Sequence, residues 1–254
     1  MLAAERRGLI FEKIQEEKSV IVSELSRAFA VSEETIRRDL EKLAEEGHVV
    51  KSYGGAVLNE KSGIDLPFNV RQKANPKGKQ MIAALVSQAV SDGEHIMLDA
   101  STTSVFIAKS IKQKENLTVI TNSIENLLEL SDAPSFHIIS TGGTFHAGTM
   151  SLLGKRAAEC IATYHVDKLF LSCKAIDPEK GVMDGSDEIA GIKQEMLRAA
   201  KKVYLAVDSS KFNKAALSLI CPLTRIDAVI TDRKPSEKWL KVFEKNRVEC
   251  IFRE

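Results

Sequence analysis

Two adjacent arginines, Arg37 and Arg38, lie in the stretch VSEETIRRDLEKL at residues 31–43, which has the spacing of an amphipathic helix. On a helical wheel, Ile36 and Leu40 fall on one side and the two guanidinium groups fall away from it. A guanidinium group can bond guanine O6 and N7 or clamp a phosphate, so an outward-facing pair suits a nucleic acid. The alternative is an ordinary helix with a solvated charged face, which is the more common arrangement.

The N-terminal half of this helix would present Thr35 beside the arginines, with Ser32 as the N-cap at its tip. A helix-turn-helix requires such a face, because its second helix enters the major groove and its first residues reach base edges and phosphates. The short connection FAVSEE suits the tight turn before that helix. The spacing alone therefore favours DNA binding modestly over a generic helical module.

A second group of reactive side chains occurs in HIMLDASTTSVFIAKSI, where a strand pattern ends at Asp99 and a helix pattern follows. Three hydroxyl residues, Ser101, Thr102 and Thr103, lie between the two patterns. Hydroxyls and free backbone N–H groups at the N-terminus of a helix suit an anion such as phosphate. The alternative is that Ser101 only caps the helix, but three hydroxyls after an acid favour a ligand slightly.

Other loops repeat this theme at the ends of predicted strands. VITNSIEN supplies Asn122 and Ser123, IISTGGTF supplies Gly142 and Gly143, and LAVDSSKF supplies Lys211. Open α/β sheets bind ligands at the carboxyl ends of their strands. The chain has no G-x-G-x-x-G and no G-x-x-x-x-G-K-S/T motif, so the sequence does not support a dinucleotide or nucleotide cofactor.

The elements that must hold the arginine pair occupy the first 58 residues. Three helical patterns follow one another: one around Ile10, one around Leu25 with Ser23 as its N-cap, and the arginine helix. HVVKSYGGAVL then predicts a β-hairpin whose two-residue turn is Gly54-Gly55. The hairpin would be a wing, with Lys51, Ser52 and Tyr53 available for contacts with the DNA backbone.

The remainder of the chain predicts a polar linker at 59–78 and an α/β domain with a largely parallel sheet at 79–254. The predicted strands are His95–Leu98, Leu117–Thr121, His137–Ser140, Asp167–Ser172, Lys202–Ala206, Ala228–Thr231 and Val248–Phe252. The predicted helices between them include Lys79–Val90, Ile124–Leu130, Ile189–Ala200 and Glu237–Glu244. The expected organisation is thus a winged helix-turn-helix at 1–58, a linker, and a larger α/β domain.

Composition and charge narrow the function. The chain has 254 residues, 44% of them hydrophobic, and a net charge of +1. Up to Leu58 it carries nine basic and eleven acidic residues, a net charge of −2, so DNA affinity would depend on where the cations lie and on more than one copy. The four cysteines form no C-x-x-C pair, which disfavours a metal site and suits a reducing compartment. We expect a cytoplasmic protein without a membrane span.

The segment VSELSRAFAVSEETIRRDLEKLAEEGHVVKSYGGAVL resembles the N-terminal signature of the DeoR family, bacterial transcription regulators of sugar metabolism. The resemblance implies a winged helix-turn-helix that binds double-stranded operator DNA. It also implies that Arg37 and Arg38 are the DNA-contacting pair, while Asp39 supports them or pairs within the fold.

Further matches to this family follow in order: LDASTT, TNS, GGTF, VDKLFLS, AVDSSKF and AVITD. They imply an effector domain with the fold of ribose-5-phosphate isomerase that binds a phosphorylated sugar. From the absence of metal-ligand spacing and of nucleotide-binding motifs, we expect no metal and no cofactor. By resemblance, Asp99 and the Ser101–Thr103 run would hold the ligand. The residues that would complete the site are Asn122, Ser123, Gly142, Gly143 and Lys211, with Lys193 as a further contact.

Two segments depart from simple expectation. The family usually has a glycine-rich loop after DKLFL, whereas this chain has SCKAID, Ser172–Asp177. MDGSDEI superficially resembles the aspartate-rich catalytic loop of ribose-5-phosphate isomerase but comes too late in the chain, so we expect a turn and a helix N-terminus with Asp187 and Glu188 in the first turn.

The combined expectation is a ligand-controlled transcription regulator, a repressor of a carbohydrate operon that acts as a homo-oligomer, either a dimer or a tetramer. One alternative is a sugar-phosphate isomerase carrying an N-terminal helical module, although we identify no catalytic acid/base pair. Another alternative is a protein-binding module in place of the DNA-binding one.

Overall fold

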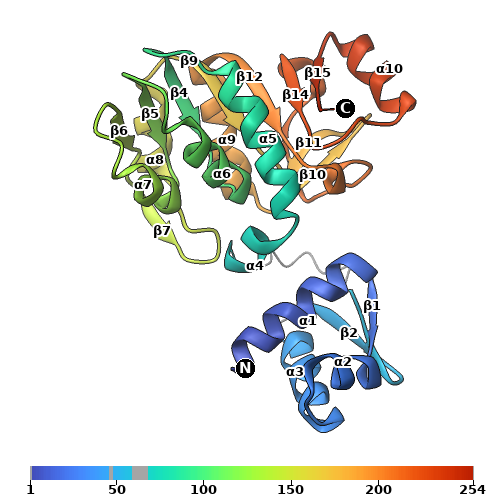
Figure 1. Ribbon diagram of the computed structural model, residues 1–254. Helices are drawn as coiled ribbons and strands as arrows, with labels where there is room; N and C mark the ends of the chain where they lie inside the picture. The colour runs from blue at the N-terminus through green and yellow to red at the C-terminus, as the bar shows by residue number, and fades with distance from the viewer. Residues whose placement is uncertain (1, 46–47, 59–67, 254) are drawn as a thin grey trace. The chain divides into compact units, whose positions relative to one another are not determined.

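The computed structural model describes residues 2–45, 48–58 and 68–253. The chain divides into two compact units, Met1–Ala74 and Asn75–Glu254. The smaller unit has one buried apolar core, and the larger unit has two. Most of the helices and strands of both units are labelled in Figure 1.

In its described residues, the smaller unit contains four helices and one antiparallel sheet with the strand order β1-β3-β2. The helices are α1 (Ala3–Glu17), α2 (Val22–Phe29), α3 (Glu33–Glu45) and α4 (Phe68–Lys73), and the strands are β1 (Ser19–Ile21), β2 (Val49–Ser52) and β3 (Gly55–Leu58). Ile10 of α1, Leu25 of α2 and Ile36 of α3 are fully buried against one another in the core. The predicted winged helix-turn-helix is therefore confirmed, with β1 as a third strand that was not predicted.

The turn between α2 and α3 is closed by local hydrogen bonds. Ala30 adopts the left-handed conformation with φ 51° and its N–H donates to the carbonyl of Arg27. The Ser26 hydroxyl donates to the carbonyl of Val31 at 2.7 Å. These bonds hold the start of α3 close to the end of α2, which is the tight connection that FAVSEE predicted.

Two local predictions in this unit are wrong. Ser23 is not an N-cap, because α2 begins at Val22 and Ile21 occupies the cap position. The hairpin turn is Tyr53-Gly54 rather than Gly54-Gly55, since Gly55 already pairs with Ser52 in the sheet. Gly55 has a different role: a Cβ there would lie 1.9 Å from the carbonyl oxygen of Val20 in β1, so only glycine fits beneath the third strand.

The larger unit is built on a seven-stranded sheet with the order β15-β14-β12-β9-β4-β5-β6, in which every pairing is parallel. The strands are β4 (His95–Leu98), β5 (Thr118–Thr121), β6 (His137–Ser140), β9 (Val166–Leu171), β12 (Ala200–Ala206), β14 (Ala228–Ile230) and β15 (Glu249–Ile251). All seven predicted strands form this sheet, so the predicted α/β class is confirmed.

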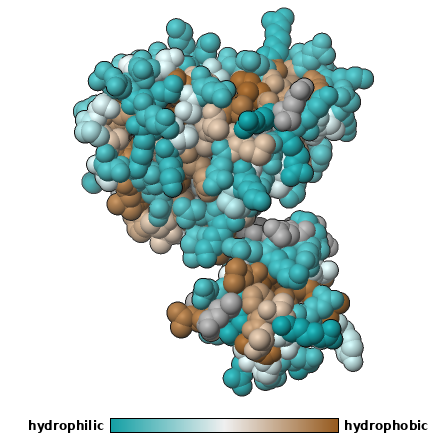
Figure 2. Space-filling view, viewed as in Figure 1, coloured by the Kyte–Doolittle hydropathy of each residue, from teal (hydrophilic) through white to brown (hydrophobic). Residues whose placement is uncertain are grey.

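Helices cover both faces of the sheet, and alternate residues of one strand enter different cores. Ile96 and Leu98 of β4 pack with α5 and α6, whereas Met97 packs on the opposite face with α8 and α9. The helices are α5 (Pro76–Ala89), α6 (Thr102–Ile111), α7 (Ile124–Leu130), α8 (Lys155–Ala162), α9 (Asp187–Ala199) and α10 (Glu237–Asn246). The strand β14 is apolar and buried throughout, because both of its faces are covered. The outer surface in Figure 2 is mostly hydrophilic.

Several smaller elements of this unit were not predicted. They are the hairpin β7 (Thr144–His146) and β8 (Ser151–Leu153), the antiparallel strands β10 (Ala175–Asp177), β11 (Gly181–Asp184) and β13 (Ser218–Cys221), and the 3-10 turns η1 (Ser209–Lys211) and η2 (Leu223–Arg225). In the segment expected as a loop, Ser172–Asp177, the last three residues form the strand β10. In the segment expected as a linker, 59–67 lies outside the described residues, while 68–73 and 76–78 are helical. No helix among the described residues is long and apolar enough to cross a membrane.

Candidate DNA-contacting face and ligand site

The outer face of α3 carries the arginine pair. Ile36 and Leu40 are buried, whereas the side chains of Arg37 and Arg38 are 58% and 78% exposed. Ser32 lies at the tip of the helix, where its Oγ accepts a hydrogen bond from the Thr35 N–H at 3.2 Å. The helix therefore presents the side chains that the wheel placed outward, and Ser32 caps it as predicted.

Each arginine is paired with an acid one turn earlier in the helix. Arg37 Nη2 donates to Glu33 Oε2 at 2.7 Å, and Arg38 Nε lies 3.6 Å from Glu34 Oε1. These carboxylates also lie at the N-terminus of α3, where the helix dipole stabilises negative charge. All four side chains are exposed, so the pairs are weak and can exchange partners.

Asp39 faces the interior, and its role is one that the sequence left open. Its carboxylate accepts a hydrogen bond from Arg6 Nε of α1 at 2.6 Å and lies 3.7 Å from Arg7 Nη1. The side chains of Arg6 and Asp39 are both buried. Asp39 therefore pairs within the fold and fastens α3 to α1 rather than supporting the arginines beside it.

The predicted wing residues are exposed. Lys51 of β2 donates to Glu41 Oε1 of α3 at 2.8 Å, and this bond together with the lysine charge holds the pKa of Glu41 below its ordinary value. Tyr53 is fully exposed at the hairpin turn. Ser23 lies on the preceding helix α2 and is half-buried.

Parallel strands bring the second set of predicted residues to one edge of the sheet. Leu98 and Thr121 are register partners in β4 and β5, so Asp99 and Asn122, which follow them, are neighbours at the strand ends. Ser172 follows β9 on the other side of β4, and its N–H donates to Asp99 Oδ2 at 2.9 Å. Lys211 lies in η1, which follows β12.

A buried cluster of charges surrounds Asp99. Lys193 of α9 lies 3.1 Å from Asp99 Oδ2, and its Nζ donates to Asp184 Oδ2 at 2.7 Å and to the carbonyl of Ser172 at 2.8 Å. Burial alone would lower the pKa of Lys193, but the two carboxylates outweigh it and raise the pKa above its ordinary value. Lys193 is therefore a buried cation that donates to two protein oxygens and lies beside a third, Asp99 Oδ2.

Two oxygens at this edge of the sheet are buried without a donor among the described residues: Asp99 Oδ1 and Asn122 Oδ1. Asp99 is 1% exposed and Asn122 is 3% exposed. A buried acceptor that lacks a hydrogen bond destabilises the fold, so such atoms in native structures usually have a missing partner. The missing partner here is a hydrogen-bond donor.

Two of the predicted hydroxyl residues act as helix caps. Ser101 Oγ accepts from the Ser104 N–H at 3.0 Å and caps α6, while Ser123 Oγ accepts from the Asn126 N–H at 3.2 Å and caps α7. The capping alternative considered for Ser101 is therefore realised. Thr102 and Thr103 occupy the first turn of α6 and are buried.

The two predicted glycines have different reasons to be glycine. Both have positive φ angles, 64° at Gly142 and 114° at Gly143. A Cβ at Gly143 would lie 2.5 Å from the carbonyl oxygen of Leu153 in β8, so this glycine allows the β7–β8 hairpin to pack. A Cβ at Gly142 would meet no atom within 4 Å, so its requirement is conformational.

Lys211 is linked electrostatically to this edge. Burial would raise the pKa of Asp208, but Lys211 and hydrogen bonds from Ser210 outweigh burial and lower it. Burial raises the pKa of the Cys173 thiol to about 12, and Lys193, Asp184, Lys211 and Asp99 all act on that thiol as weaker influences. Lys211 lies in the same turn as Asp208, since its backbone N–H donates to the Asp208 carbonyl at 3.1 Å.

Sequence reasoning missed Asp184 and Asn126. Asp184 ends β11 in the MDGSDEI segment, where Ser186 caps α9 and Asp187 lies in its first turn as predicted. Asn126 Nδ2 donates to the carbonyl of Asp99 at 3.1 Å and bonds Ser104 and Thr121, which fixes the ends of β4 and β5. The sequence hinted at these two residues only by their polar side chains: Asn126 ends TNSIEN, and Asp184 is the acid in VMDG.

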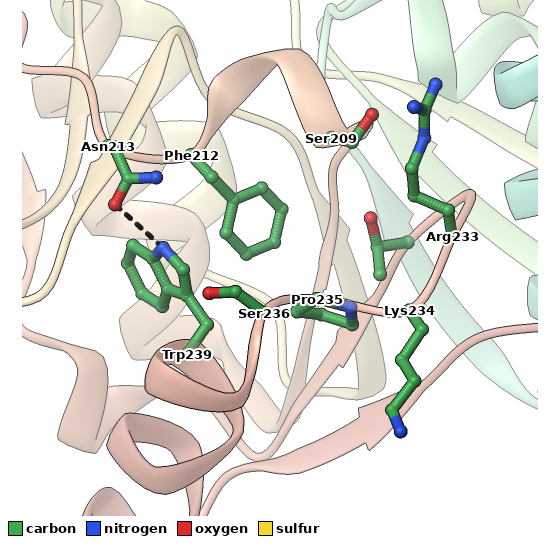
Figure 3. Close-up of a pocket in the computed structure, with 9 residues that line it drawn as sticks. Ser209, Phe212, Asn213, Arg233, Lys234, Pro235, Ser236 and Trp239 are labelled. Carbon is green, nitrogen blue, oxygen red and sulfur yellow. Dashed lines mark hydrogen bonds between the residues drawn. The ribbon is translucent and has the colours of Figure 1, made fainter.

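A separate cavity of about 180 Å³ adjoins η1 (Figure 3). It is lined by Ser209, Phe212, Asn213, Thr231, Arg233, Lys234, Pro235, Ser236 and Trp239. Trp239 Nε1 donates to Asn213 Oδ1 at 2.9 Å, and Phe212 packs edge-on against the indole ring. Arg233 and Lys234 point away from this aromatic wall, and neither belongs to the predicted site.

The chain matches two family models. Residues 6–62 match the DeoR-like helix-turn-helix domain, and residues 74–233 match the DeoR C terminal sensor domain. These two models describe a DNA-binding module and a sensor, which are the two predicted functions.

Similar proteins span nearly the whole chain. The uncharacterized HTH-type transcriptional regulator YulB of Bacillus subtilis (strain 168) is 39% identical over 98% of this chain and 96% of its own length. The putative aga operon transcriptional repressor of Escherichia coli O157:H7 is 31% identical over 98% of this chain and 93% of its own length. The HTH-type transcriptional repressor GlcR of Bacillus subtilis (strain 168) is 31% identical over 100% of this chain and 98% of its own length.

A likeness to solved structures is weaker. Ribose 5-phosphate isomerase A from Methanocaldococcus jannaschii is 15% identical, with a TM-score of 0.41, over 55% of each chain. A likeness at this level says nothing about activity. The family models and the relatives describe regulators and not enzymes, so the isomerase alternative and the protein-binding alternative are not supported. The chain belongs to the DeoR family of DNA-binding transcriptional regulators.

Proposed function

We propose that this regulator represses a carbohydrate-metabolism operon and is released from its operator by a phosphorylated sugar bound at the strand ends of the larger unit. Two relatives are named as transcriptional repressors, one of them of the aga operon, which supports repression as the direction of control. The sensor domain in the family model supports a ligand as the signal.

The unpartnered oxygens Asp99 Oδ1 and Asn122 Oδ1 carry this proposal. A ligand that supplies hydrogen-bond donors to both would remove the penalty of two buried acceptors at once. Hydroxyl groups on adjacent carbons of a sugar are such donors. The two acceptors belong to residues that follow register partners on neighbouring strands, which supports one ligand that binds both.

The phosphate group would lie away from Asp99. The Asp99–Lys193–Asp184 cluster contains two carboxylates for one ammonium, so its net charge disfavours a dianion. The first turn of α6 offers backbone N–H groups beside Thr102 and Thr103, and Lys211 adds a positive charge at the same edge. Lys193 then acts by holding Asp99 in place instead of contacting the phosphate.

On the DNA side, we propose that Arg37 and Arg38 contact base edges and phosphates, together with Ser32 and Thr35 at the tip of α3. Lys51 and Tyr53 of the wing would contact the backbone, and Ser23 would do so from α2. The exposure of the arginines beside the buried Ile36 supports this face.

We also propose that the protein acts as a homo-oligomer, a dimer or a tetramer. A recognition module with a net charge of −2 has little general attraction for DNA, whereas two linked copies reading two half-sites raise the effective concentration of the second. Sedimentation of the full chain, free and on operator, tests this point. A monomer at micromolar concentration in both states would contradict it.

The ligand proposal is tested by thermal unfolding of the full chain with a panel of sugar phosphates and the corresponding free sugars. A ligand that binds only the folded state raises the midpoint by mass action. Any active sugar phosphate is then added to the operator complex, whose dissociation is followed by fluorescence anisotropy. If no sugar phosphate stabilises the protein or releases the operator, the proposal fails.

Variants of the pocket sharpen this test. Asp99→Ala removes a charge-assisted bond to a hydroxyl, so ligand affinity should fall by about 1.5–3 kcal/mol while operator binding without ligand is retained. Lys211→Ala should likewise weaken the response to sugar phosphate. Lys109→Ala, an exposed lysine in the last turn of α6, is the control with the same loss of charge. A pocket variant that responds at the parent's ligand concentration would place the sensor elsewhere.

A further inference from the structure

The three cations expected at the DNA are each paired with an acid of α3. Arg37 bonds Glu33, Arg38 lies beside Glu34, and Lys51 of the wing bonds Glu41. The side chains of these three acids are 46%, 65% and 54% exposed. The proposed DNA-contacting face therefore carries its own carboxylate counter-charges on the surface.

This arrangement opposes general attraction to DNA. Non-specific binding depends almost wholly on cations that neutralise phosphates and release the condensed counterions. Carboxylates beside those cations make each contact with a phosphate less favourable and repel phosphates directly. The surplus of acids over bases up to Leu58 agrees with this effect.

The pairing need not oppose recognition of base edges. Arginine has five N–H donors in a rigid fork, and the bond to Glu33 uses one nitrogen of Arg37, Nη2. The remaining donors can still reach guanine O6 and N7.

We propose that Glu33 and Glu34 are specificity determinants, which weaken binding to non-operator DNA while leaving N–H donors of Arg37 and Arg38 available for base contacts in the operator. Glu41 acts on the phosphate-binding lysine of the wing and affects general affinity alone. The proposal rests on the proposed DNA-contacting face. It goes further by assigning a function to the acids of that face.

The test measures the affinity of the full chain for an operator duplex and for a scrambled duplex of the same composition across a salt series. The operator is first located by gel shift with the promoter of the chain's own operon. In Glu33→Gln and Glu34→Gln, we expect affinity for the scrambled duplex to rise by about 3- to 10-fold. The slope of log affinity against log salt should steepen by up to about 0.9 for each further phosphate that the variant neutralises. Operator affinity should change less than about twofold, so the ratio of the two affinities falls.

Glu17→Gln is the matched control. It breaks an exposed pair of the same i,i+4 kind, Lys13–Glu17 at 2.6 Å, in the same unit and with the same change of charge, but on α1. The ratio of operator to scrambled affinity should stay at the parent's value. A control that changes the ratio as much as Glu33→Gln would show that net charge alone matters, and would overturn the proposal.

Two further outcomes reject the role of the acids. Equal rises in affinity for both duplexes would mean that the acids only add charge, and a loss of operator affinity without a rise on the scrambled duplex would make them base contacts or fold residues. Thermal unfolding of each variant separates the last two cases. If Arg37→Ala with Arg38→Ala leaves operator affinity unchanged, the face itself is wrong. If the double arginine variant loses operator affinity and the Glu→Gln variants give either of the two outcomes above, the DNA-contacting face stands and only the role of Glu33 and Glu34 is rejected.

Discussion

The proposed DNA-contacting face of α3 and the proposed ligand site at the strand ends both contain ion pairs, but the two regions differ in how far these pairs are buried. Arg37 and Glu33 are 58% and 46% exposed, whereas Lys193 and Asp99 are 9% and 1% exposed. Exposed pairs are screened by water and salt and exchange readily. A buried charge cannot lose its partner without a large penalty. A surface that must exchange protein for DNA therefore needs the first kind, and a rigid ligand site needs the second.

The largest effect is expected from breaking the buried cluster. Lys193→Met removes the buried ammonium that pairs with both Asp99 and Asp184, so the free energy of unfolding of the larger unit should fall by about 3–5 kcal/mol. Urea unfolding followed by circular dichroism measures this loss. Lys109→Met, on the exposed end of α6, is the control, and an equal small change in both variants would contradict the comparison.

The second effect concerns the buried pair of the smaller unit. Arg6→Ala removes the closest partner of Asp39, but Arg7 at 3.7 Å partly compensates. We therefore expect the free energy of unfolding to fall by about 3 kcal/mol, the lower end of the range for a broken buried pair. Lys13→Ala on the same helix breaks an exposed pair and should cost less than about 1 kcal/mol. If the two variants unfold at the same urea concentration, burial does not distinguish the pairs in this unit.

The third effect should appear in binding and not in stability. Arg37→Ala and Arg38→Ala should each reduce operator affinity by about 1–3 kcal/mol. As exposed sites, they should change the free energy of unfolding by no more than about 0.5 kcal/mol. The neighbouring Ile36→Ala should do the reverse and destabilise the fold by about 2–5 kcal/mol, because it empties a fully buried site. Anisotropy titrations and urea unfolding of the same samples separate the two effects.

The smallest effect is the contribution of one exposed pair to stability. Glu33→Gln should lower the free energy of unfolding by about 0.3–0.5 kcal/mol at low salt, and the difference should disappear at about 1 M salt. A salt-independent loss larger than about 1 kcal/mol would show that this pair behaves like the buried ones.

The sequence pattern was sufficient to predict a feature wherever that feature depends on one short segment alone. The apolar runs at His95–Leu98 and Ala228–Thr231 predicted strands because both faces of a parallel sheet are buried. The spacing of Ile36 and Leu40 predicted which way Arg37 and Arg38 face, because a helix has one period. These predictions need no knowledge of any distant residue.

Contacts between distant segments lay beyond such reasoning. Asp39 has the same neighbours in the sequence whether it supports Arg38 or pairs with Arg6, and only the packing of α1 on α3 decides between them. The Tyr53-Gly54 turn likewise depends on β1, whose carbonyl approaches Gly55 too closely for a side chain.

The proposed ligand site shows the same division. The residue types at Asp99 and Asn122 indicated polar strand ends, because each follows an apolar run in its own segment. That Lys193 and Asp184 close around Asp99 depends on the packing of α9 and β11 against the ends of β4 and β9. The free energy of a buried charge depends on which charges come near it in space, and sequence separation does not encode that distance.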